Sequence, residues 1–154
     1  MSFRIAGLDP DPYLALFGLS DAALAARGVE RVRVEAKPGA PCRISLDDAE
    51  IGEHVLLLSY QHQPADTPYR QQGPIFVRNT RERFESVGVV PPAMARRPLS
   101  LRGFDTSHRM IEAELCDGAD AAELIKTFFA HTAVSTIHAH YARRGCFAAA
   151  IGRA

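Results

Sequence analysis

His138 and His140 are the first candidates for chemistry in this chain. They lie two residues apart in segment 136–142, and Arg143-Arg144-Gly145 separates that segment from the small and apolar segment 146–151. Because the glycine can take the left-handed conformation that closes a three-residue loop, we predict a β-hairpin here. Histidines two apart on a strand share one face, about 7 Å from each other. There they could act as general acids and bases, bind an anion or coordinate a metal.

The loop length predicts a register for this hairpin, with Tyr141 opposite Phe147, His140 opposite Ala148 and His138 opposite Ala150. One face is then apolar and faces the core. The other face carries both histidines and Cys146 above alanine methyl groups. We expect an open pocket on that face if the principal helix covers the apolar side. If the helix instead covers the alanines, the histidines are structural residues that bond neighbouring backbone.

A metal bound by His138 and His140 would require at least one more ligand from elsewhere in the chain. The candidates are Cys42, Glu53, His54 and His62, and their spacing selects none of them. Cys146 is a weak candidate for a nucleophile because no helix N-terminus precedes it to lower its pKa. We therefore assign Cys146 to the lining of a ligand site.

A second group of polar residues follows the apolar segment His54–Tyr60, which predicts a central strand. Residues 61–73 read as a long polar loop, and they contain His62, Tyr69 and Arg70. Arg78 ends the next predicted strand. Together with the hairpin histidines, His62 is a candidate catalytic residue, and Tyr69, Arg70 and Arg78 are candidate anion ligands. The alternative is that these loop residues are simply solvated.

The remaining patterns predict an α+β fold in a single domain, residues 1–154, with a mainly antiparallel sheet of about six strands. The last helix is predicted with a capping box formed by Asp120 and Glu123. The other predicted elements are strands at 3–6, 30–35, 75–78, 99–104 and 110–115, short helices at 11–17 and 20–26, a helix or turn at 81–87, a polar stretch at 41–50, a linker at 91–98 with a solvent-facing Arg96-Arg97 pair, and a packed helix at 120–131.

Composition narrows the classes of partner. Lysine plus arginine and aspartate plus glutamate number 18 each, which argues against a nucleic-acid surface. Three scattered cysteines argue against a disulfide framework, and the chain shows neither a signal-peptide pattern nor a membrane span. We therefore predict a cytoplasmic protein that binds neither nucleic acid nor membrane.

Several segments together carry a family resemblance. They are residues 38–49, 52–62, 68–70, 73–78 and the hairpin 138–148. These segments resemble the bacterial domain-of-unknown-function family numbered 1203, over nearly the whole chain. The resemblance implies a bacterial source, and it carries over no catalytic residues.

The sequence thus predicts a site between the His62–Arg70 segment and the His138/His140 face. The expected function is binding of a small anionic ligand, with a divalent transition metal as the candidate cofactor if the protein is an enzyme. The alternative function is a noncatalytic homodimer that pairs through a sheet edge or the alanine-rich face.

Overall fold

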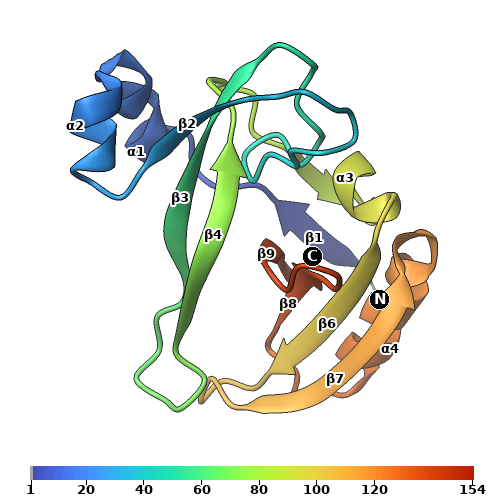
Figure 1. Cartoon of the computed structure of the whole chain (residues 1–154). Helices are drawn as coiled ribbons and strands as arrows, with labels where there is room; N and C mark the ends of the chain where they lie inside the picture. The colour runs from blue at the N-terminus through green and yellow to red at the C-terminus, as the bar shows by residue number, and fades with distance from the viewer. Residues whose placement is uncertain (1) are drawn as a thin grey trace.

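The structure is a computed structural model, and it describes residues 2–154 as two antiparallel sheets with short helices around them (Figure 1). Sheet A has the strand order β5-β1-β9-β8-β6-β7, and sheet B has the order β2-β3-β4. The strands are β1 Phe3–Ala6, β2 Glu30–Arg33, β3 His54–Gln63, β4 Gln71–Val77, β5 Glu85–Val87, β6 Pro98–Phe104, β7 Met110–Asp117, β8 Thr136–Tyr141 and β9 Phe147–Arg153. The α+β class and a six-stranded sheet are confirmed, and the separate sheet B was not predicted.

The helices are short, and α4 is the longest of them. They are α1 Asp11–Leu14 with a following 3-10 turn Ala15–Gly18, α2 Asp21–Ala25, α3 Pro92–Ala95 and α4 Ala121–Ala130, which a 3-10 turn Gly118–Asp120 precedes. Ser20 caps α2 by accepting a hydrogen bond from the Ala23 amide at 3.1 Å. Among residues 2–154, no helix combines the length and apolar character that crossing a membrane would require.

Helix α4 decides which side of the C-terminal hairpin is covered. Its residues Ile125, Phe128 and Phe129 are buried in one cluster with Ile137 and Ile151 of the hairpin. The apolar face of sheet A is therefore the covered one, and sheet B faces the histidine side (Figure 1). The predicted capping box is absent. Asp120 holds the N-cap position, but its side chain caps no amide because it has helical dihedral angles after the 3-10 turn.

The C-terminal hairpin has the predicted register only in the half that lies away from its turn. Ile137, His138 and Ala139 pair with Ile151, Ala150 and Ala149 as expected. A bulge follows, and His140 pairs with Phe147 rather than with Ala148. Because one extra residue reverses the side to which a strand's side chains point, the bulge moves the Phe147 ring to the histidine face. The prediction of Phe147 on the core face was therefore wrong.

Segment 41–49, predicted as a polar stretch, is largely buried between the two sheets. Cys42, Ile44 and Leu46 are fully enclosed, and Arg43 is only 1% exposed. The segment bridges to β4 through Cys42 and Phe76, and the Arg43 carbonyl accepts a hydrogen bond from the Leu8 amide at 2.8 Å. The alternation of Cys42, Ile44 and Leu46 is a strand-like pattern that the charged residues of the segment concealed.

Three other boundaries differ from the prediction. Strands β3 and β4 extend into the expected loop and shorten it to residues 64–70. Residues 85–87 form edge strand β5 rather than a helix, because they complete the hydrogen bonds of β1. Residues 92–95 form α3 in place of a linker, with Pro92 in its first turn.

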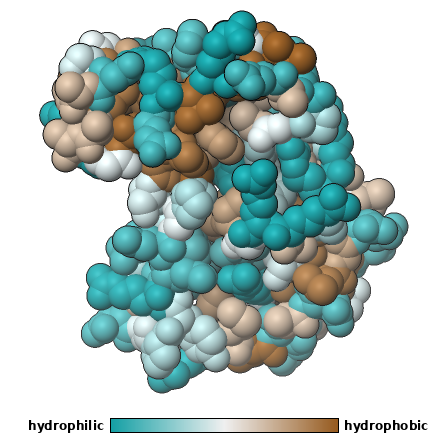
Figure 2. Space-filling view, in the orientation of Figure 1, coloured by the Kyte–Doolittle hydropathy of each residue, from teal (hydrophilic) through white to brown (hydrophobic). Residues whose placement is uncertain are grey.

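Figure 2 shows how these elements shape the surface. Apolar residues gather below α1 and α2, whereas the part of the surface around the 64–70 loop is mainly hydrophilic. The apolar residues belong to a cluster in which Leu16 and Phe17 pack against sheet B. The N-terminal helices thus cover sheet B in the way that α4 covers sheet A.

Gly7 provides a test of how closely the backbone after β1 packs against the buried segment 41–49. A Cβ atom at residue 7 would lie 1.9 Å from the Ile44 carbonyl oxygen. We predict that Gly7→Ala lowers the free energy of unfolding by about 1–3 kcal/mol, because the backbone must move to accept the methyl group. Urea denaturation measures this. Gly18→Ala is the control, since nothing lies within 4 Å of the added atom. Equal stability of the two variants would contradict the packing described here.

Candidate functional site

Three histidines from two sheets meet at one place. His138 and His140 lie on β8, and His62 lies near the end of β3. The ring centroid of His62 is 4.9 Å from that of His140 and 6.2 Å from that of His138. The Phe147 ring stacks on His62 at 5.2 Å, nearly parallel to it. The bulge in β9 thus supplies the aromatic ring against which the three imidazoles pack.

These histidines line a cavity of about 220 Å³, here named the histidine pocket. Its walls come from β3, β4, β6, β7, β8 and the 64–70 loop, so the two clusters between which the sequence predicts a site lie together in the structure. No carboxylate lines the pocket. The complete lining is His62, Gln63, Pro68, Tyr69, Arg70, Gln71, Arg102, Phe104, Met110, His138 and His140.

Hydrogen bonds define the proton positions on two of the rings. Nδ1 of His140 donates to the Gly145 carbonyl oxygen at 2.9 Å, which leaves Nε2 as the acceptor of a neutral ring. Nε2 of His62 donates to Oε1 of Gln71 at 3.1 Å. Nδ1 of His62 and Nδ1 of His138 are buried without a hydrogen-bond partner. Buried polar atoms are normally satisfied, so these two nitrogens mark an incomplete site.

The pocket keeps its histidines neutral. Burial lowers the pKa of His138 to about 4 and that of His140 to about 3, and the charge of Arg102 acts in the same direction. Burial also lowers the pKa of His62. A buried imidazolium would be favoured by a nearby carboxylate, and this pocket has none. At neutral pH the three rings therefore carry no charge.

Arg102 supplies the positive charge of the pocket, and the sequence did not single it out. It lies on β6 opposite His138 of β8. Its guanidinium makes only long contacts, 3.3 Å to Oε1 of Gln71 and 3.4 Å to Oγ of Ser100. Burial lowers its pKa. Strand pairing between β6 and β8 brings Arg102 to the histidines. No local sequence pattern predicts which strands pair.

Of the other predicted ligand residues, two line the histidine pocket and two do not. Tyr69 and Arg70 line the histidine pocket, where Tyr69 packs edge-on against Phe104 at 6.1 Å. Arg78 lies elsewhere and donates two hydrogen bonds to Glu53, at 2.6 and 2.9 Å. Cys146 faces the buried Arg43 instead of the histidines.

None of the candidate third metal ligands except His62 reaches His138 and His140. Cys42 accepts backbone hydrogen bonds, Glu53 pairs with Arg78, and His54 is exposed. Within residues 2–154, no group of three or more histidine, cysteine, aspartate or glutamate side chains is arranged to hold a metal ion.

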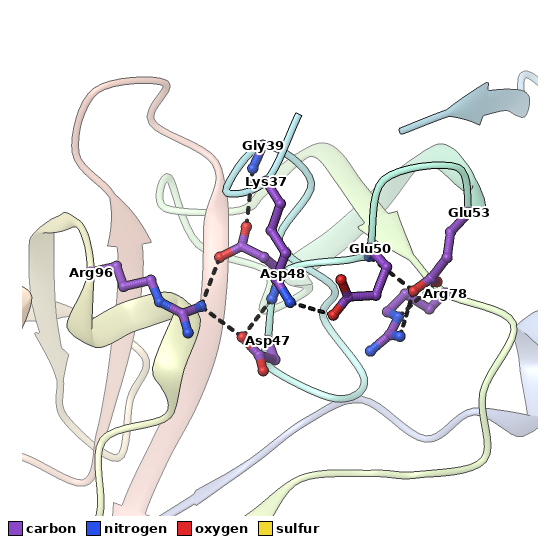
Figure 3. A network of polar contacts seen from close by, with 8 residues as sticks. All are labelled: Lys37, Gly39, Asp47, Asp48, Glu50, Glu53, Arg78 and Arg96. Atoms are coloured by element: carbon purple, nitrogen blue, oxygen red, sulfur yellow. Dashed lines mark hydrogen bonds and ion pairs between the residues drawn. The ribbon is translucent and has the colours of Figure 1, made fainter. Parts of the chain in front are cut away.

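A second polar centre surrounds Asp48, whose side chain is fully buried (Figure 3). Arg97 donates to both of its oxygens, at 2.6 and 2.9 Å, and Arg96 bridges Asp47 and Asp48. Burial alone would raise the pKa of Asp48, but the hydrogen bonds from Arg97 and Gly39 hold it below its usual value. The expectation that Arg96 and Arg97 face solvent was therefore wrong for Arg97, which anchors α3 to the buried segment.

The lowered histidine pKa values predict a dependence of stability on pH. The unfolded chain binds a proton at each histidine below about pH 6.5, whereas folded His140 stays neutral until about pH 3. Acidification from pH 7 to 5 should therefore destabilise the protein. His140→Asn keeps a donor for Gly145 and should reduce this loss by about 1–2 kcal/mol.

Urea unfolding at the two pH values measures this difference. His54→Asn is the control because His54 is exposed, and its variant should retain the pH dependence of the parent protein. The same loss of stability in His140→Asn as in the parent would contradict the assignment of His140 as a buried neutral residue.

Comparison with known proteins assigns the chain to a family but does not indicate a function. A family model described as "Protein of unknown function (DUF1203)" matches residues 39–153. Comparison with curated proteins and with solved structures finds no match. The matched region contains all of the residues that line the histidine pocket. The chain therefore belongs to the DUF1203 family, as its sequence resemblance predicts.

Proposed function

We propose that this protein binds a small anion, a carboxylate or an oxyanion, in the histidine pocket. The observation that carries the proposal is the charge of the lining, in which two arginines and three histidines face one cavity without a carboxylate. Arginine is well suited to oxyanions because its guanidinium presents several donors in one plane. A volume of about 220 Å³ fits a ligand of a few heavy atoms.

Arg102 and Arg70 have separate parts in this proposal. Arg102 is partly buried and lacks a strong protein acceptor, so an anion would replace its long contacts with a charge-assisted hydrogen bond. Arg70 is exposed on the 64–70 loop at the rim of the pocket. It would attract an anion from solvent and close over it. The pocket needs no metal for this function, because the arginines supply the positive charge.

Binding would couple to proton uptake. The free pocket disfavours charged histidines through burial and through the charge of Arg102. A bound anion opposes that charge and favours the imidazolium form, so the pKa of His138 and His140 would rise in the complex. By linkage, the affinity for an anion of constant charge then increases as the pH falls. His140 Nε2, which has no hydrogen in the neutral ring, is the atom that would receive the proton.

Sulfate is the probe for this proposal because its charge is constant between pH 5 and 8. We expect calorimetric titration to show tighter sulfate binding at pH 6 than at pH 8, with proton uptake revealed by buffers of different ionisation enthalpy. Arg102→Gln should weaken binding about tenfold or more, the loss of one charged hydrogen bond. The variant should fold normally, since Arg102 makes only long contacts.

Arg109→Gln is the matched control, because Arg109 is exposed and does not line the histidine pocket. NMR signals of the histidine rings locate the site, and those of His138 and His140 should shift with sulfate. Unchanged ring signals, or equal sulfate affinity in Arg102→Gln and Arg109→Gln, would exclude the histidine pocket as the anion site.

A further inference from the structure

The structure contains a second and larger cavity. It has a volume of about 520 Å³ and is here named the arginine cavity, because five arginines line it: Arg43, Arg96, Arg97, Arg143 and Arg144. The two cavities share no lining residue. Phe147 connects them, since its ring stacks on His62 and its carbonyl oxygen accepts a hydrogen bond from Nε of Arg43 at 2.6 Å.

The arginine cavity has an excess of positive charge. Asp47 and Asp48 neutralise Arg96 and Arg97. Within residues 2–154, no carboxylate forms an ion pair with Arg43, Arg143 or Arg144. Three positive charges therefore remain, and one of them is buried. A buried charge is costly unless it is paired, so this arrangement favours an anionic ligand.

Tyr141 also lines the arginine cavity. Its side chain is 4% exposed, and its hydroxyl group has no hydrogen-bond partner. Burial raises its pKa to about 12, so it remains a donor at neutral pH. The guanidinium carbons of Arg43 and Arg97 lie 4.9 and 5.2 Å from its ring centroid, and these contacts hold the ring in place. A buried hydroxyl group without a partner at a cationic cavity is the second observation that points to a ligand.

The rest of the wall is apolar and rigid. It contains Pro38, Pro41, Pro74, Pro98, Leu57 and Phe76. Such a wall fits a flat hydrophobic body better than a hydrated ion, and 520 Å³ is within the range of cavities for small organic ligands. The excess of three positive charges favours a group with two negative charges over a single carboxylate.

We infer that the arginine cavity binds a phosphate monoester with a flat apolar body. The phosphate lies at the Arg43 and Tyr141 end, where the Tyr141 hydroxyl donates to one phosphate oxygen. Arg143 and Arg144 extend from the exposed hairpin loop and contact the phosphate from the solvent side. The apolar body lies against Phe76 and the prolines. This site does not depend on the function proposed for the histidine pocket.

Phenyl phosphate is the probe that tests the inference, measured by calorimetric titration of the full chain at pH 7.5. Benzoate keeps the aromatic ring but carries a single negative charge, so it tests the need for a doubly charged group. Inorganic phosphate lacks the ring, so it tests the need for an apolar body. We expect phenyl phosphate to bind at least tenfold more tightly than either. No detectable binding of phenyl phosphate at millimolar concentration would overturn the inference. Equal affinity for benzoate, or for inorganic phosphate, would overturn the ligand class.

Two variants locate the site. Tyr141→Phe removes a buried hydroxyl group that makes no hydrogen bond within the protein, so the thermal midpoint without ligand should not fall. The affinity for phenyl phosphate should fall about three- to tenfold, the value of one hydrogen bond. Arg143→Gln/Arg144→Gln changes only the exposed loop and should lower affinity by a similar factor or more.

Matched controls separate this site from general electrostatic attraction and from the histidine pocket. Arg33→Gln/Arg109→Gln removes two exposed arginines that line neither cavity and should leave the affinity unchanged. Arg102→Gln, which alters the histidine pocket, should also leave it unchanged. If the Arg143/Arg144 and Arg33/Arg109 double variants lose affinity equally, or if Tyr141→Phe binds as the parent does, phenyl phosphate does not bind in the arginine cavity as inferred.

Discussion

The buried guanidinium of Arg43 is the interaction on which both halves of the molecule depend. Its side chain donates to the Phe147 carbonyl of sheet A and to the Pro41 carbonyl of its own segment, while its backbone amide donates to the Phe76 carbonyl of sheet B. The planar guanidinium offers five donors in a fixed arrangement, which suits it to several carbonyl partners at once. The two sheets are therefore joined through one residue, whose side chain bonds sheet A and whose backbone bonds sheet B.

Phe147 also connects residues of the two cavities. The bulge in β9 directs the Phe147 ring toward the histidines and its carbonyl group toward Arg43. A regular strand would place the Phe147 ring on the α4 side and leave His62, His138 and His140 without their aromatic wall. The bulge thus places the Phe147 ring against the histidines and its carbonyl group against Arg43.

Charge is distributed unevenly although the chain as a whole has formal net charge zero. Acidic residues are absent from the lining of the histidine pocket, and in the arginine cavity they pair with only two of the five arginines. Burial beside positive charge, without a carboxylate in the lining, lowers the pKa of His138 and His140. The Tyr141 hydroxyl group is buried without a hydrogen-bond partner.

Local sequence patterns were sufficient for the elements themselves. The Arg143-Arg144-Gly145 connection predicted the hairpin, and local patterns predicted helices at 20–26 and 120–131 that overlap α2 and α4. The α+β class and the family follow from such patterns, because they depend on neighbours in the chain. The long polar loop and the helix or turn at 81–87 differ from the structure because parts of both segments pair as strands, and residues 92–95 form α3 in place of the predicted linker.

The sequence alone therefore determined the elements, the shared face of His138 and His140, and the family. The tertiary structure decided which other residues lie beside His138 and His140. Arg102 joins the histidines through the pairing of β6 with β8, His62 arrives from the other sheet, and Arg78 is held by Glu53 instead. Arg43 looked like one polar residue in a polar stretch, and only the packing of two sheets made it a buried charge. Strand pairing over long separations is set by the burial of the whole chain, and residue spacing carries no record of it.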